Sequence, residues 1–389
     1  MGFKCGIVGL PNVGKSTLFN ALTQSNKALA ANYPFATIEP NIGRVAVPDD
    51  RLIKLTNIAK SQKTIPAYID FVDIAGLVKG ASKGEGLGNK FLSHIREVDA
   101  IAHVVRCFED ENITHVSNII DPKKDIETIE TELKLADLET IENKLQSLEK
   151  KSKSGEKSIK SKIEIVKEIQ LLINNNKSIR NLSFSLEENL FYESLNLISS
   201  KPILYVCNLD EKSLINGNDF TRYIEEKSMK ESNRSVNVSA SIESQIAEFE
   251  NINDKKEFLN DFGMEEDALK KLINSGYDLL NLNTFFTCGP KETRAWTIIK
   301  NSTASQAAGK IHTDFEKGFI RAETISYEDF VTFAGEAGSR EAGKLRQEGK
   351  EYIVKDGDVL NFRFNTWPYF FHAQIHKYRQ YYKIYNNSK

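Results

Sequence analysis

The clearest chemical signature in this chain is an octapeptide near its start, Gly9-Leu10-Pro11-Asn12-Val13-Gly14-Lys15-Ser16, which fits the pattern G-x-x-x-x-G-K-[ST]. An apolar run at residues 5–8 precedes it and an amphipathic stretch at residues 17–22 follows it, as a strand–loop–helix context requires. The glycines let backbone N–H groups surround phosphate oxygens at a helix N-terminus. Lys15 adds a cation beside the β- and γ-phosphates, and the Ser16 hydroxyl is placed to bind magnesium. The chain is therefore expected to bind a nucleoside triphosphate.

Two further segments are expected to face the γ-phosphate. Asp73-Ile74-Ala75-Gly76 fits D-x-x-G after a strand, where the carboxylate would hold a water on magnesium and the Gly76 N–H would contact the phosphate. Residues 79–88 contain four glycines and are costly to order, which favours a switch segment. Thr37, within residues 33–40, is expected to offer its hydroxyl to magnesium and its N–H to the γ-phosphate.

Leu77 follows Gly76 directly, at the place where many switch-type hydrolases carry a water-orienting glutamine. A leucine side chain cannot polarise water. Catalysis is then slow, or the orienting group comes from elsewhere or from a bound cation. His94, Arg96 and His103 lie within reach in the sequence, although a lone histidine is more often structural.

The base-recognition element departs from the guanine pattern N-K-x-D. Asn208-Leu209-Asp210-Glu211 follows an apolar run, so Leu209 replaces the lysine and Glu211 replaces the aspartate. The extra methylene of Glu211 displaces the carboxylate enough to spoil a paired hydrogen bond, and Asp210 stands one residue early. Val238-Ser239-Ala240 fits the loop that closes over a base. A site without its guanine carboxylate loses much of its discrimination, which favours adenine.

The surrounding sequence predicts an α/β fold with a doubly wound sheet. Short β-branched runs at residues 4–8, 67–72, 101–107 and 203–208 are typical of parallel strands buried on both faces, and they alternate with helical patterns around the phosphate loop. This nucleotide-binding domain is assigned to residues 1–120 and 201–282.

Between these two parts, apolar residues recur three or four apart from Ile126 to Leu148 and again from Ile159 to Ile173. This pattern predicts two long helices in an antiparallel coiled-coil insertion, residues 121–200. Its Lys/Ser-rich tip is either a solvated turn or the end of an arm that contacts a partner. Residues 283–366 predict a small α+β domain, and residues 367–389 form an aromatic and basic tail.

The overall composition is that of a globular protein: 389 residues, 40% apolar and 27% charged, with a net charge of -2. Any contact with nucleic acid must therefore come from a local basic patch. The four cysteines lack metal or disulfide spacing, and neither a membrane span nor a signal peptide is evident. We expect a cytoplasmic monomer that does not associate with membranes.

Together these motifs resemble the Obg-like ATPase or YchF family of translation-associated hydrolases. The resemblance is carried by residues 9–17, 73–92 and 208–211, and by Phe333-Ala334-Gly335-Glu336-Ala337-Gly338 with Gly349-Lys350-Glu351-Tyr352 beyond it. It implies a P-loop hydrolase domain with an inserted coiled coil, then a TGS domain with a β-grasp fold. It also implies preference for ATP over GTP, dependence on Mg²⁺, and association with the ribosome or ribosomal RNA.

The resemblance also implies roles for single residues. Asn12 to Thr17 would bind the phosphates, Ser16 and Thr37 would bind magnesium, Leu209 would contact adenine, and Asn12 would help to hold a potassium ion. The expected catalytic residues are Lys15, Thr37, Asp73 and Gly76. The expected nucleotide-binding residues are Asn12, Val13, Gly14, Lys15, Ser16, Thr17, Asn208, Leu209, Glu211, Ser239 and Ala240.

Two alternatives stay open at this point. The chain is a true GTPase of the Obg group, or it is a ribosome- or RNA-binding module in which the nucleotide only stabilises the fold. The first predicts that GTP displaces ATP, and the second predicts ribosome binding that survives loss of the nucleotide site.

Overall fold

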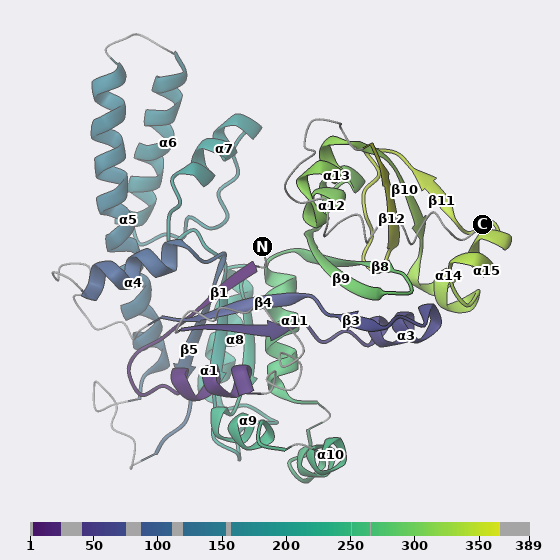
Figure 1. Cartoon of the computed structure of the whole chain (residues 1–389). Coiled ribbons are helices and arrows are strands. Elements are labelled where there is room, and N and C mark those ends of the chain that lie inside the picture. The colour runs from purple at the N-terminus through teal and green to yellow at the C-terminus, as the bar shows by residue number, and fades with distance from the viewer. Residues whose placement is uncertain are drawn as a thin grey trace. The chain divides into compact units, whose positions relative to one another are not determined.

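The computed structural model describes residues 3–24, 41–74, 87–110, 120–152, 157–249, 251–264 and 266–365, without the side chains of residues 87–90, 157 and 252. The chain divides into two compact units (Figure 1). Unit 1 comprises Met1–Pro48 and Tyr68–Asn281, and unit 2 comprises Asp49–Ala67 and Leu282–Lys389. Residues 49–67, which the sequence assigns to the nucleotide-binding domain, therefore belong to unit 2.

Unit 1 is built on a sheet with the strand order β2-β4-β1-β5-β6-β7. Its strands are β1 (Phe3–Val8), β2 (Ile42–Ala46), β4 (Tyr68–Asp73), β5 (Ala100–Arg106), β6 (Ile203–Asn208) and β7 (Arg234–Val238). β2 pairs antiparallel with β4, and the remaining pairs are parallel. Every residue of β5 and β6 is buried, so other elements cover both faces of the sheet. The predicted α/β fold is confirmed.

Helices pack against this sheet and against each other. The described helices of unit 1 are α1 (Lys15–Gln24), α4 (Leu87–Arg96), α5 (Pro122–Ser152), α6 (Lys157–Asn174), α7 (Leu186–Ser194), α8 (Asp219–Lys230), α9 (Ala240–Ile246), α10 (Ile252–Asp261) and α11 (Ala268–Leu279). α1 packs against α9, α5 against α8, and α11 against β6 and β7.

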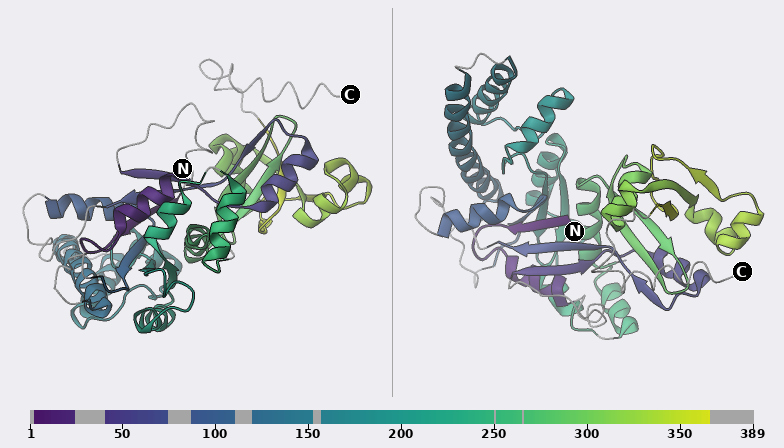
Figure 2. Two further views of the ribbon diagram at one scale, coloured as in Figure 1. Left: turned by 90° about the horizontal axis from the view of Figure 1, so that it is seen from below. Right: turned by 45° about the horizontal axis from the view of Figure 1, so that its top comes forward.

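The insertion is a helical hairpin in which α5 and α6 run in opposite directions and lie side by side in all views (Figures 1 and 2). Apolar residues of both helices are buried between them and against α7, including Ile141, Leu148, Val166 and Ile169. The predicted apolar stripes thus become the hairpin core, because residues three and four apart share one helix face. That the two helices supercoil stays a prediction.

Asp137 attaches this hairpin to the rest of unit 1. It is fully buried on α5, and its carboxylate accepts hydrogen bonds from the Ile198 N–H at 2.8 Å and the Ser199 N–H at 2.7 Å. The Ser199 hydroxyl donates a third at 2.6 Å. Three donors on one carboxylate hold the long helix to the loop that precedes β6.

Unit 2 contains a second, mixed sheet with the order β11-β10-β12-β8-β9-β3. Its strands are β3 (Lys63–Ile65), β8 (Leu282–Cys288), β9 (Glu292–Ile299), β10 (Phe319–Ile325), β11 (Arg346–Glu348) and β12 (Val359–Phe364), and its described helices are α3 (Asp50–Ala59), α12 (Ala304–Ile311), α13 (Thr313–Lys317), α14 (Tyr327–Thr332) and α15 (Glu336–Glu341). α12 packs its three alanines against Phe285 and Leu360. β8 is parallel to β12 and antiparallel to β9. A helix packed on a mixed sheet is the arrangement expected for a β-grasp fold; assignment to the TGS class stays a prediction.

Candidate functional site

The phosphate-binding loop spans residues 9–14, between β1 and α1. Asn12 and Gly14 have φ angles of 62° and 97°, the left-handed region. A Cβ on Gly14 would overlap the Asn208 amide, and one on Gly9 would lie 2.5 Å from the Val104 carbonyl oxygen. Close approach of other atoms therefore requires both glycines of the motif, and the backbone conformation adds to the requirement at Gly14.

Lys15 is buried at the start of α1. Its Nζ donates a hydrogen bond to the Leu10 carbonyl at 2.6 Å, within the loop. Burial lowers the pKa of Lys15, while the charge of Asp73 opposes this shift. Reciprocally, burial raises the pKa of Asp73, and Lys15 opposes it. The lysine of the first motif and the aspartate of the second are thus near enough for the charge of each to act on the pKa of the other.

Oxygen donors suited to magnesium lie at the same edge of the sheet. Ser16 is exposed in the first turn of α1, and Asp73 ends β4 at the register position of Ile7 on β1. Hydroxyl and carboxylate oxygens are ligands that Mg²⁺ prefers, usually together with water and substrate phosphates. Thr37 and Gly76 lie outside the described residues, and no cluster of His, Cys, Asp or Glu that could hold a metal by itself occurs within the described residues.

Asn208 connects three parts of the site. Its Nδ2 donates a hydrogen bond to the Val13 carbonyl at 2.9 Å, and its Oδ1 accepts one from the Ala240 N–H at 2.9 Å. Leu209 is buried, and its N–H donates to the Val238 carbonyl at 2.8 Å. The end of β6, the phosphate-binding loop and the Ser239–Ala240 loop therefore form one hydrogen-bonded assembly.

The two carboxylates that follow Leu209 behave differently. Asp210 accepts the Ser213 N–H at 3.1 Å and so stabilises the turn after the strand. Glu211 and Thr17 are exposed, and Ser239 is buried with its hydroxyl 3.1 Å from that of Ser241. Nucleotide contacts of Leu209, Glu211, Ser239 and Thr17 stay predictions.

The three side chains considered as replacements for glutamine have different environments. His94 is exposed on α4. Arg96 donates a hydrogen bond to the Thr140 hydroxyl at 2.8 Å, which is a structural contact with α5. His103 is 1% exposed on β5, and burial lowers its pKa to about 4. Leu77 lies outside the described residues.

One residue of this region escaped the sequence analysis. Glu243, one turn into α9, is completely buried and accepts the Ala268 N–H at 2.8 Å. A glutamate in a short polar helix is usually a solvent-exposed residue, so only its position just after the predicted base loop could have marked it.

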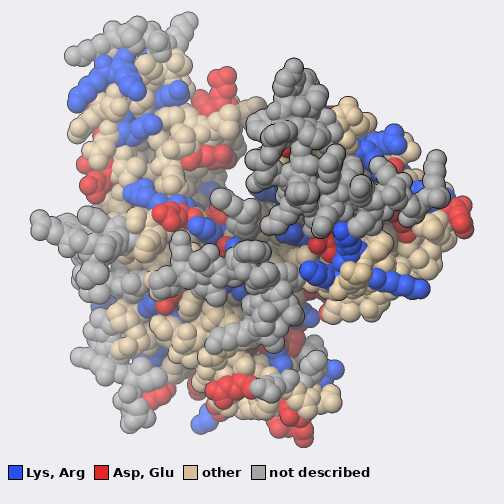
Figure 3. Space-filling view, viewed as in Figure 1, with Lys and Arg blue, Asp and Glu red and all other residues tan. Residues whose placement is uncertain are grey.

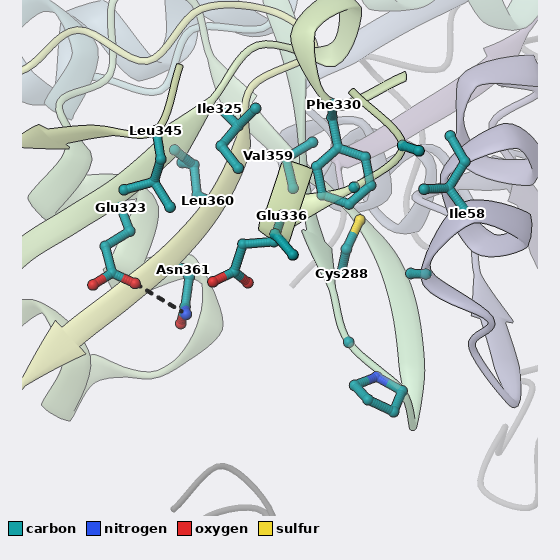
Figure 4. A pocket seen from close by; sticks show the side chains of 16 residues that line it. Ile58, Cys288, Glu323, Ile325, Phe330, Glu336, Leu345, Val359, Leu360 and Asn361 are labelled. Carbon is teal, nitrogen blue, oxygen red and sulfur yellow. Dashed lines mark hydrogen bonds between the residues drawn. The ribbon is translucent and has the colours of Figure 1, made fainter. Parts of the chain in front are cut away.

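A cavity of about 270 Å³ lies within unit 2, between the sheet and residues of α3, α14 and α15 (Figure 4). Ile58, Phe330 and Val359 supply apolar surface, and Glu323 and Glu336 supply carboxylates. Glu323 is paired with Arg363 at 2.9 Å and Glu336 with Arg340 at 2.7 Å. The cavity has none of the phosphate-binding features of unit 1 and is separate from the site assembled there.

Among the described residues, no helix is both long and apolar enough to cross a bilayer.

Comparison with known proteins adds to this geometry. A family model described as "50S ribosome-binding GTPase" matches residues 4–144, and a model of the YchF GTPase C-terminal region, described as "Protein of unknown function (DUF933)", matches residues 282–365. The chain is 55% identical over 366 residues to the "Ribosome-binding ATPase YchF" of Escherichia coli O157:H7, covering 94% of this chain and 100% of that relative. It is 53% identical over 368 residues to the protein of the same name in Bacillus subtilis (strain 168), with the same coverage.

Solved structures agree with this result. The Schizosaccharomyces pombe YchF GTPase matches with a TM-score of 0.83 and 39% identity, covering 93% of this chain and 98% of that one. A GTP-binding protein from Pyrococcus horikoshii OT3 matches with a TM-score of 0.57 at 20% identity, covering 93% and 100% of the two chains, which supports the fold alone. With this identity along nearly the whole of its curated relatives, the chain belongs to the YchF family.

Proposed function

We propose that this protein is a magnesium-dependent, ATP-binding and ATP-hydrolysing switch that associates with the ribosome. The observation that carries the proposal is the single assembly formed by the phosphate-binding loop, Asn208 and Ala240, with Lys15 beside Asp73. Curated relatives at 55% and 53% identity are named ribosome-binding ATPases.

In this proposal Lys15 exchanges its bond to the Leu10 carbonyl for the β- and γ-phosphate oxygens. Charge attraction and burial favour that exchange, because a buried ammonium group is stabilised more by phosphate charge than by one carbonyl dipole. Ser16 and Thr37 would hold the magnesium ion, and Asp73 would hold a water on it. Bound there, the ion would supply positive charge beside the phosphates, and Asn12 would help to hold a potassium ion with the same effect.

Preference for ATP follows from the side chains after β6. The Asp210 carboxylate already accepts the Ser213 N–H, and Glu211 is one methylene longer than the aspartate that pairs with guanine. Leu209 and the backbone of Ser239 and Ala240 then form a surface suited to adenine. Because no carboxylate waits for the 2-amino group of guanine, adenine, which lacks that group, binds with little penalty. Leu77 supplies no water-orienting group, so intrinsic hydrolysis is slow.

The ribosome is the proposed partner, and the free end of the hairpin is a proposed contact with ribosomal RNA. Lys and Arg side chains gather there (Figure 3), and Lys150, Lys151 and Lys160 are exposed. Lysines on a projecting surface neutralise phosphate groups and release counterions. The proposal includes a cytoplasmic monomer, with the TGS class for unit 2.

Calorimetric titration with non-hydrolysable analogues of ATP and GTP tests the nucleotide proposal. The wild type is expected to bind the ATP analogue at least about tenfold more tightly, and Lys15→Ala should abolish binding. Lys54→Ala, which removes an exposed lysine of unit 2, serves as the matched control. Tighter binding of GTP would instead establish the GTPase alternative.

Co-sedimentation with ribosomes tests the switch. Lys15→Ala should lose the dependence of co-sedimentation on ATP, whereas Lys150→Glu with Lys151→Glu should weaken co-sedimentation and leave ATP binding intact. Unchanged co-sedimentation of Lys15→Ala in every nucleotide state would favour the binding-module alternative.

A further inference from the structure

Glu243 is tied to the base loop through the backbone of α9. This helix begins at Ala240, directly after Ser239. The Glu243 N–H donates to the Ser239 carbonyl at 2.9 Å. The side chain of Glu243 is completely buried, so it points into the protein one turn away from the residues expected to cover the base.

The Glu243 carboxylate contacts the start of another helix. Its Oε1 accepts the N–H of Ala268, the first residue of α11, at 2.8 Å. The first N–H groups of a helix have no partner within the helix, and the positive end of the helix dipole favours a negative charge there. Oε2 is buried and has no hydrogen-bond partner within the described residues. The bond to Ala268 therefore joins α9 to the first turn of α11.

A chain of contacts runs from the phosphate-binding loop to this carboxylate. Asn208 bonds to the Val13 carbonyl on one side and to the Ala240 N–H on the other, and α9 carries the connection on to Glu243 and α11. The Ser239–Ala240 loop is therefore attached at one side through Asn208 and at the other through Glu243.

α9 needs such an attachment because it has little stability of its own. It contains seven residues, and Ser239 makes no side-chain hydrogen bond that caps it, whereas isolated helices of this length do not persist. Ile242 and Ile246 pack with Leu214 and Leu259. Apolar contacts of this kind are non-directional, whereas a hydrogen bond to one backbone atom specifies a single position for the helix.

We propose that Glu243 is a positioning residue for the nucleotide base: its bond to α11 holds α9, and with it the backbone of Ser239 and Ala240, where that backbone contacts the purine. The inference rests on the proposed function. Removal of the Glu243 bond should therefore weaken contacts with the base and leave the phosphate contacts unchanged.

The charged groups around Glu243 provide a matched control. Asp267 caps α11 by accepting the Lys270 N–H at 2.8 Å, and its other oxygen accepts Lys255 Nζ at 2.6 Å. Burial raises the pKa of Glu243 to about 7; the Ala268 N–H opposes this shift, Asp267 adds to it, and Lys255 and the Leu269 N–H oppose it. Asp267 stabilises the same helix end as Glu243 without a hydrogen bond to α9, so Asp267→Ala reports the effect of a weakened α11 alone.

The test uses calorimetry on the full chain with two probes, a non-hydrolysable ATP analogue and inorganic triphosphate. Glu243→Met, similar in length but without an acceptor, should lower the affinity for the ATP analogue about tenfold and change that for triphosphate by less than about twofold. Asp267→Ala should change the two affinities alike or not at all. Equal losses for both probes in Glu243→Met, or a loss of base-dependent affinity in Asp267→Ala, would overturn the proposal.

Glu243→Gln decides the question if the methionine variant does not fold. Its amide oxygen keeps the acceptor but does not titrate. From about pH 6 to about pH 8 the wild type should gain affinity for the ATP analogue relative to Glu243→Gln, because only the ionised carboxylate strengthens the bond to α11. The phosphates of the ATP analogue titrate in the same way with both proteins, so their effect cancels in the ratio of the two affinities. If that ratio does not change with pH, the role of Glu243 is refuted. If the wild type binds neither the ATP analogue nor the GTP analogue, the proposed function itself is disproved.

Discussion

Asn208 and Val13 lie 195 residues apart in the sequence, and their side-chain amide and backbone carbonyl are joined by a hydrogen bond of 2.9 Å. This bond holds the phosphate-binding loop against the end of β6. Because Asn208 also accepts the Ala240 N–H, one amide side chain determines the spacing between the phosphate and base regions.

Asn208→Ala is expected to lower the free energy of unfolding by about 2–6 kcal/mol, because two buried backbone groups lose their partners at about 1–3 kcal/mol each. Chemical denaturation measures this change, and calorimetry should show weaker nucleotide binding. Asn216→Ala, in an exposed turn, should alter neither quantity. An Asn208→Ala protein of wild-type stability would contradict the bridging role.

Asp137→Ala should destabilise unit 1 by about 3 kcal/mol or more, since the Ile198 and Ser199 N–H groups and the Ser199 hydroxyl lose a shared, buried acceptor. Thermal melting monitored by circular dichroism provides the measurement. The matched variant is Glu139→Ala, two residues away on the exposed side of α5, for which the melting temperature should stay within experimental error.

His103 predicts acid sensitivity. Burial lowers its pKa to about 4 from an ordinary value of 6.5, so between these values the unfolded chain binds the proton and the folded chain does not. The contribution of His103 to the free energy of unfolding is therefore lost as the pH falls from about 6.5 towards 4, by roughly 3 kcal/mol at most. Measured relative to wild type, the denaturant midpoint of His103→Gln should rise as the pH falls over this range, whereas that of the exposed His94→Gln should stay parallel to wild type.

Glu243 predicts the opposite slope. Its folded pKa of about 7 lies above the ordinary value of 4.5, so the protonated folded form is favoured, and its contribution to stability is present below about pH 4.5 and lost as the pH rises through 7. Between about pH 4.5 and 6.5 the contribution of His103 to the free energy of unfolding rises with pH while that of Glu243 falls, so the two partly cancel in the wild type. The free energy of unfolding of Glu243→Gln, measured by denaturation relative to wild type, should therefore rise by up to roughly 3 kcal/mol as the pH rises from about 4.5 to 7.

The double variant Leu209→Lys with Glu211→Asp should shift selectivity towards guanine. It restores the N-K-x-D pattern at residues 208–211, and a carboxylate paired with guanine is worth a discrimination of at least about tenfold. Competition between ATP and GTP analogues measures the ratio. Asp210→Asn, which alters only the neighbouring carboxylate, should leave the ratio unchanged.

Much of unit 1 could be predicted because its strands are short, apolar and placed directly before motif residues. The sequence predicts β6 at its observed bounds. The hairpin helices are predicted because polar residues on their outer faces alternate with the apolar residues that form the hairpin core. In each case the signal is local, so neighbouring residues suffice to reveal it.

Relationships over long range could not be predicted. Thr64 on β3 pairs with Thr293 on β9, and nothing within either short segment specifies the other. The role of Glu243 was missed for the same reason: its partner, Ala268, is a backbone N–H, and every residue except proline has one. The sequence displays side-chain chemistry, whereas this contact depends on where a helix begins.

The placement of residues 49–67 in unit 2 bears on how the chain is made. Ser61 and Gly289 are hydrogen-bonded but 228 residues apart, so at about 5–20 residues per second the ribosome needs roughly 10–50 s to supply the partners of α3 and β3. During that interval Leu52 and Leu55, buried in the finished protein, have no unit 2 to cover them. A fragment that stops at residue 281 would keep these leucines uncovered permanently and is expected to aggregate, unless residues 49–67 are replaced by a short polar linker.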